Sequence, residues 1–123
     1  MLPNKIEENV QKALKDLESA LDAYFKKRID EAKLKVWKAS SEIEYLLFLL
    51  EFSHNLKNPV SDDTLNNQNK ELDMAESIVK AQELLQDALK FCEEKNLKKA
   101  HEKIWVARGY LIILQERIER GNV

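Results

Sequence analysis

One internal repeat restricts the fold of this sequence more than any other feature. Residues 5–51 align with residues 73–119 without a gap, giving thirteen identities in forty-seven pairs, among them Trp37 with Trp105. At further positions one apolar residue replaces another, as Val36 and Ile104 do. Repeated units of this kind bury equivalent faces against each other. The alignment therefore predicts one structural unit used twice.

Each repeat has the apolar spacing of two amphipathic helices, with apolar residues three or four positions apart. The expected helices cover about residues 4–28, 31–53, 72–94 and 97–120. Asn4 and Asp30 are the expected N-caps, and Asn96 the expected left-handed residue at the second turn. The predicted fold class is all-α, with four long helices as two tandem duplicated hairpins in an antiparallel four-helix bundle.

The expected domain organisation is a single domain over residues 1–123. It consists of hairpin repeat one at 5–54, a flexible linker at 55–71 that is rich in Asn and Asp, and hairpin repeat two at 72–121. We expect the two hairpin turns to lie at the same end of the bundle, and Trp37 and Trp105 to occupy equivalent environments.

Composition indicates a cytoplasmic protein without a membrane-spanning segment. A net charge of −2 gives no general attraction to nucleic acid or to an anionic membrane. The single cysteine, Cys92, excludes an internal disulfide and suits a reducing compartment. The longest nearly uncharged run, residues 45–50, is far shorter than the roughly 20 residues that cross a bilayer.

No stretch has the pattern of a catalytic, cofactor-binding or metal site, so we expect no enzyme and no cofactor. His54 and His101 are the only histidines, and we expect them at opposite ends of neighbouring helices. Glu51 and His54 have the Glu-x-x-His spacing of di-iron bundles, but the equivalent pair in the second repeat is Glu119 and Asn122. A metal role is therefore not favoured.

The helix expected at 31–53 is apolar on two sides, although a surface helix should be polar on one. Its second apolar side consists of Leu34, Trp37, Tyr45, Phe48, Leu49 and Phe52. Aromatic residues of this kind are enriched in protein interfaces. We therefore expect a non-catalytic protein–protein interaction or assembly module, with a homodimer or a helical protein as partner. Residues 54–71 are the alternative cover for this side.

Basic residues surround both expected hairpin turns. They are Lys26, Lys27, Arg28, Lys33, Lys95, Lys98, Lys99 and Lys103. If the two turns lie together, these side chains form a possible contact surface for a polyanion. The alternative function is therefore a nucleic-acid-associated protein. It is not favoured, because lysines at a helix carboxyl end are stabilising without any ligand.

Residues 87–95 (DALKFCEEK), followed by Ala100, Ala107 and Gly109, resemble an archaeal family of small helical-hairpin proteins. That family is a domain of unknown function, so the resemblance implies a hairpin fold and an archaeal source but no chemistry. The first hairpin departs from the pattern, with Ser41 at the position of Gly109. A further comparison is with the RNase-type helical bundles called HEPN, whose active members carry an Arg a few residues before a His. This chain has no Arg four to seven residues before either histidine, so the comparison does not support RNase activity.

Overall fold

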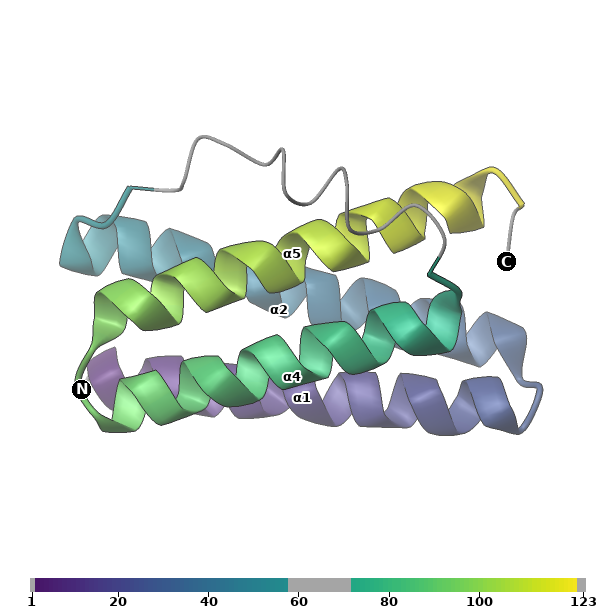
Figure 1. Cartoon of the computed structure of the whole chain (residues 1–123), viewed down its shortest axis with the longest axis horizontal. Helices are drawn as coiled ribbons and strands as arrows, with labels where there is room; N and C mark the ends of the chain where they lie inside the picture. Colours follow the sequence, from purple (N-terminus) through teal and green to yellow (C-terminus); the bar gives the residue numbers. More distant parts are fainter. Residues whose placement is uncertain (1, 58–71, 122–123) are drawn as a thin grey trace.

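The computed structural model describes residues 2–57 and 72–121. In this part of the chain it contains four helices and no strand. They are α1 (Leu2–Phe25), α2 (Ile29–His54), α4 (Met74–Glu93) and α5 (Leu97–Glu119), as Figure 1 shows. Helix α1 packs against α2 and α4, and α5 packs against α4 and α2. The predicted all-α four-helix bundle is confirmed. Residues 58–71, most of the predicted linker, lie outside the described residues.

The two hairpin turns have the same backbone structure. Lys27 and Lys95 both adopt the left-handed conformation with φ of 62°. The next amide in each turn donates to a carbonyl five residues back, Arg28 to Ala23 and Asn96 to Phe91, both at 2.8 Å. This pattern satisfies the last carbonyls of a helix, and glycine usually occupies the left-handed position.

Three residues expected to cap or terminate helices, Asn4, Asp30 and Asn96, do not have the expected roles. Helix α1 begins before Asn4, and Asp30 lies inside the first turn of α2, so neither is an N-cap. Lys95, rather than Asn96, is the left-handed residue. The Asn96 side chain instead accepts a hydrogen bond from the amide of Lys99 at 3.3 Å, because it is the N-cap of α5.

Helix α4 begins at a reciprocal cap. The Asp73 carboxylate accepts from the amide of Glu76 at 2.8 Å, and the Glu76 carboxylate accepts from the amide of Asp73 at 3.0 Å. Two amides that the helix itself leaves without partners are thereby bonded.

Replacing Asp73 with alanine should lower the free energy of unfolding by about 1 kcal/mol. Asp73→Asn should retain most of the stability, because the amide oxygen still accepts a hydrogen bond. Urea denaturation of the two variants beside the natural protein measures the difference. An Asp73→Ala variant as stable as Asp73→Asn would show that the cap contributes nothing.

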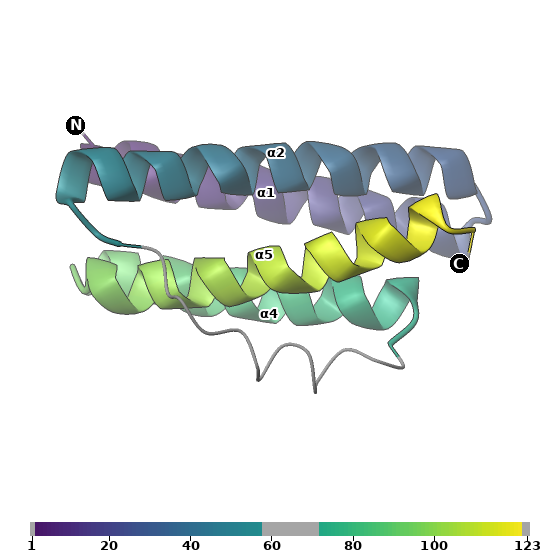
Figure 2. The same ribbon diagram turned by 90° about the horizontal axis from the view of Figure 1, so that it is seen from above.

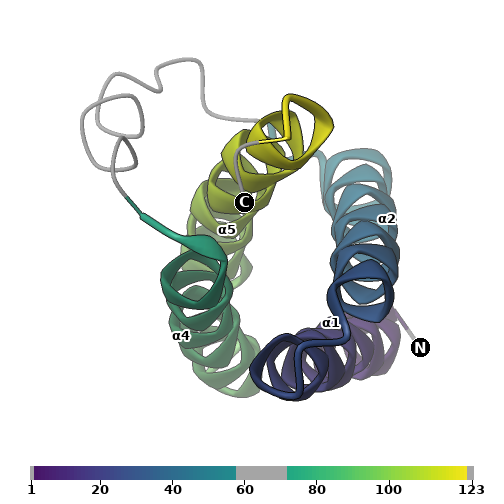
Figure 3. The ribbon, with the colours of Figure 1, turned by 90° about the vertical axis from the view of Figure 1, so that its right-hand side faces the viewer.

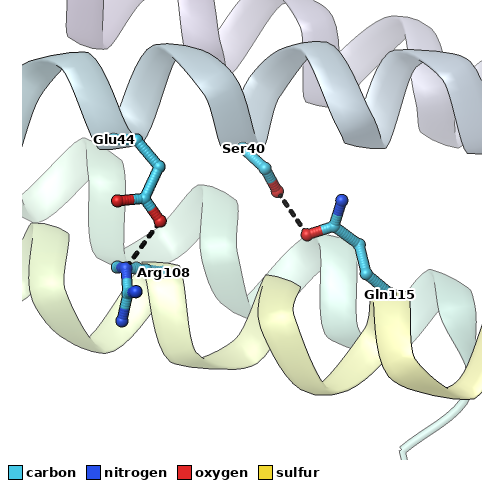
Figure 4. A network of polar contacts seen from close by, with 4 residues as sticks. All are labelled: Ser40, Glu44, Arg108 and Gln115. Atoms are coloured by element: carbon cyan, nitrogen blue, oxygen red, sulfur yellow. Dashed lines mark hydrogen bonds and ion pairs between the residues drawn. The ribbon is translucent and has the colours of Figure 1, made fainter.

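All adjacent helices run antiparallel, and the two hairpin turns lie at opposite ends of the bundle (Figures 1 and 2). Figure 4 shows the direction of α5 relative to α2: Ser40 bonds to Gln115 at 3.0 Å, and Glu44, one turn later, bonds to Arg108 at 2.7 Å. The expectation that both turns share one end is therefore wrong. Equivalent helices still pair, α1 with α4 and α2 with α5, as they would around a twofold axis perpendicular to the helices.

The core repeats along with the turns. Most of the fully buried positions of α1 and α2 are fully buried again 68 residues later in α4 and α5, such as Leu17 with Leu85 and Leu46 with Leu114. Leu50 is an exception, since its equivalent Ile118 is only partly buried. The tryptophans differ, since Trp37 is exposed whereas Trp105 is half-buried against the core. The prediction of equivalent tryptophan environments is therefore wrong. An origin by gene duplication remains an inference from the sequence.

Candidate interaction surface

The outer side of α2 carries a row of exposed apolar side chains, called here the outer row. Its members are Leu34, Trp37, Tyr45, Phe48 and Phe52, with 55%, 59%, 42%, 55% and 78% of their surfaces exposed. At about 100° per residue these positions fall on one side of the helix, opposite the buried residues. The rings of Phe48 and Phe52 stack with their centroids 5.6 Å apart.

Leu49 was expected in this row, but the structure buries it, with only 8% of its surface exposed. It lies seven residues, close to two helical turns, after Glu42 and therefore on the same flank of α2. That flank faces α1, because Glu42 interacts with Asp16 of α1. The assignment of Leu49 to the interaction face is wrong for this reason.

The equivalent helix α5 does not carry such a row. The positions that correspond to Leu34, Phe48 and Phe52 are held by Glu102, Glu116 and Arg120, all exposed. The remaining two correspond to Trp105 and Ile113, both half-buried. Because α5 has the same place in its hairpin, the fold does not require apolar side chains at the positions of Leu34, Phe48 and Phe52.

An ion pair joins α2 to α5 beside the outer row. The Arg108 Nε donates to Glu44 at 2.7 Å (Figure 4). The guanidinium of Arg108 lies 4.8 Å from the centre of the Trp105 ring. The contact holds α2 against the second hairpin, and the guanidinium lies against Trp105, which is less exposed than Trp37.

Charged side chains border the outer row and change sign along α2. Lys33, Lys35 and Lys38 lie in its amino-terminal half, whereas Glu42, Glu44 and Glu51 lie in its carboxyl-terminal half. Near the middle of the row stands a small exposed residue, Ser41. Two acidic residues, Asp30 and Glu31, occupy the first turn of α2, where a helix amino terminus favours negative charge.

The basic residues of the two turns do not form one surface. Because the turns lie at opposite ends, the cations divide into a group around residues 26–33 and a group around residues 95–103. Helix α1 spans the distance between the two ends and is roughly 36 Å long, since it has 24 residues. Neighbouring carboxylates also pair with these cations, as Asp22 does with Lys26 at 3.1 Å. The expected eight-cation cluster is therefore wrong.

The two histidines lie at the same end of the bundle, contrary to expectation. Glu51 of α2 acts on the pKa of His101 in α5, and His54 follows Glu51 by one turn. The expectation failed because it assumed the wrong direction for the second hairpin. Burial lowers the pKa of His101 and outweighs the opposing effect of Glu102 and Glu51. In the described part of the chain, no group of three or more His, Cys, Asp or Glu side chains is arranged to hold a metal ion.

Cys92 is buried at the carboxyl end of α4. Burial, with smaller contributions from the charges of Glu7 in α1 and of Glu93, raises the pKa of its thiol to about 11. A thiol with such a pKa is protonated near neutral pH and is a weak nucleophile.

One pair of carboxylates went unrecognised in the sequence. Burial raises the pKa of Glu42 to about 7, and Asp16 of α1 contributes through a hydrogen bond and through repulsion between like charges. Lys12 and Lys38 act in the opposite direction. Counting about 100° per residue places Asp16 on the side of α1 that faces α2, and Glu42 on the side of α2 that faces α1. The spacing of these residues in the sequence could therefore have predicted the contact.

No family model matches this sequence, and neither a curated protein nor a solved structure with significant similarity was found. Across the two described ranges, none of the helices combines the length and the apolar content needed to span a bilayer.

Proposed function

We propose that this protein is a non-catalytic interaction or assembly module, which binds a helix of a partner protein on the outer row of α2. The observation that carries the proposal is the row itself, five apolar side chains aligned along one exposed helix face. Four of them are aromatic, and such residues at helical spacing are typical anchors of helix-to-helix recognition.

The area of the outer row supports the proposal. Large apolar side chains offer up to about 200 Å² each, so these partly exposed residues present on the order of 500 Å². A contiguous apolar patch of that size is at the upper end for a monomer and often marks a binding surface.

The second hairpin supplies an internal comparison. Helix α5 needs the same inward-facing residues as α2, yet it carries Glu102 and Glu116 where α2 carries Leu34 and Phe48. The apolar outer residues therefore serve something other than the core, and binding is the physical role that exposed aromatic residues best fit.

Photocrosslinking in cells of the source organism tests the proposal. A photoreactive amino acid at Ser41 should form crosslinks to protein, whereas the same group at Glu116 of α5 should form few. In a Phe48→Glu, Phe52→Arg background, which carries the residues of the second hairpin at these two positions, the crosslinks from position 41 should be lost. Equal crosslinking from both helices, or crosslinks that survive the double substitution, would contradict the proposal.

A further inference from the structure

We infer that the helix bound on the outer row is α2 of a second copy of this chain, packed antiparallel around a twofold axis that passes close to residues 42 and 43. The inference rests on the proposed function and names the partner for the same surface.

The position of α2 leaves its outer side available. Helix α2 packs against α1 and α5, and it lies at a corner of the bundle when viewed along the helices (Figure 3). The outer row points away from both neighbours, because the buried residues occupy the opposite side of the helix. Another copy can therefore lay its own α2 along the row.

The outer row can pack against the same row of a second copy that runs antiparallel to it. Leu34 and Phe52 are eighteen residues apart, which is five helical turns, so they share one angular position on α2. A twofold axis midway between them places Leu34 of one copy against Phe52 of the other, twice by symmetry. The small Ser41 lies near the axis, where two helices approach each other most closely.

The flanking charges favour the same direction. Lys33 and Glu51 are also eighteen residues apart and share one flank of α2. A twofold axis perpendicular to the helix keeps that flank on the same side of the interface, so Lys33 of one copy faces Glu51 of its mate. A parallel arrangement would place lysine beside lysine and glutamate beside glutamate, which opposes association.

The area also fits a pair of identical copies. A stable interface buries about 800 Å² on each partner, with an apolar centre and a polar rim. The outer row supplies on the order of 500 Å² of apolar centre. The charged residues beside it supply the rim. A twofold pair uses this one surface on both copies, so no second patch is needed.

Sedimentation equilibrium of the full chain tests the charge pairing. The natural protein should form a dimer at about 50 µM, a range in which modest interfaces are populated. Lys33→Glu and Glu51→Lys should each weaken dimerisation about tenfold, and the double variant should recover to within about threefold of the natural protein. Lys98→Glu, a matched charge reversal at the start of α5, should leave dimerisation unchanged.

Disulfide trapping tests the direction of the helices in a Cys92→Ala background. A mixture of Leu34→Cys and Phe52→Cys chains should form mixed disulfides readily, and Leu34→Cys alone should form few. Efficient trapping of Leu34→Cys with itself would overturn the antiparallel arrangement, as would a double charge variant that fails to recover. A natural protein that stays monomeric would overturn the second copy as partner. If the natural protein is monomeric, crosslinks from position 41 to a different protein would still support the proposed function. An absence of crosslinks would contradict both the proposed function and the dimer.

Discussion

Replacing Leu46 with alanine should lower the free energy of unfolding by about 3 kcal/mol. Leu46 is fully buried in the core, where the inner faces of the helices meet. The substitution removes three carbon atoms from a close-packed interior, and the cavity left behind adds to the lost burial. Urea denaturation followed by circular dichroism measures the change, with all proteins at one concentration because association adds to apparent stability.

Leu114→Ala should cost a similar amount, because Leu114 is the equivalent residue of α5 and is also fully buried. Glu116→Ala is the matched control on the exposed side of the same helix, and it should change the stability by less than about 0.5 kcal/mol. A large loss for Leu46→Ala beside a negligible one for Leu114→Ala would show that the two halves of the core are packed differently.

The second large effect concerns pH. At about pH 8 the Glu42→Gln variant should have a free energy of unfolding about 1 kcal/mol higher than that of the natural protein. This value is smaller than the pKa shift alone would give, because solvent screens the partly exposed pair of Glu42 and Asp16. The pKa of Glu42 is raised to about 7 in the folded state, from an ordinary value of 4.5. Between these values the folded state binds more protons than the unfolded state, so the stability of the natural protein falls as the pH rises.

The advantage of Glu42→Gln should therefore be full above pH 7 and should disappear as the pH falls toward 4.5. Denaturation at a series of pH values between these limits gives the profile. Asp16→Asn should also flatten it, since removing the neighbouring carboxylate removes a cause of the raised pKa. Parallel profiles for the natural protein and Glu42→Gln would contradict this account of the pair.

The outer row was largely predictable from the order of residues, because helical phase depends only on sequence spacing. Counting 100° per residue from Leu34 leads to Phe48 and Phe52. The exception is Leu49, which lies at the edge of the row. At that position the helical spacing does not determine whether the side chain is exposed or buried. Its burial depends on how closely the next helix approaches, and that distance is a property of the packed bundle.

Helix ends were less predictable than helices. Asn4 and Asp30 have suitable side chains for capping, yet the helices begin before them. The left-handed residue of each turn is a lysine, a residue type with no preference for that conformation. Tertiary packing of the two helices determines where each turn must close, and the local residues adapt at a cost of about 1 kcal/mol.

The helices, their inward faces and all of the exposed row except the limit at Leu49 could be predicted from residue order, because each follows from periodicity along a single chain segment. The direction of the second hairpin depends instead on how the two hairpins pack against each other. Helical periodicity specifies which residues of each helix face inward but carries no information on the direction in which one hairpin runs along the other. The antiparallel choice separated the basic turns, brought His54 and His101 to one end, and joined Glu44 to Arg108. These relations depend on contacts between distant segments, and such contacts exist only once the two hairpins have packed.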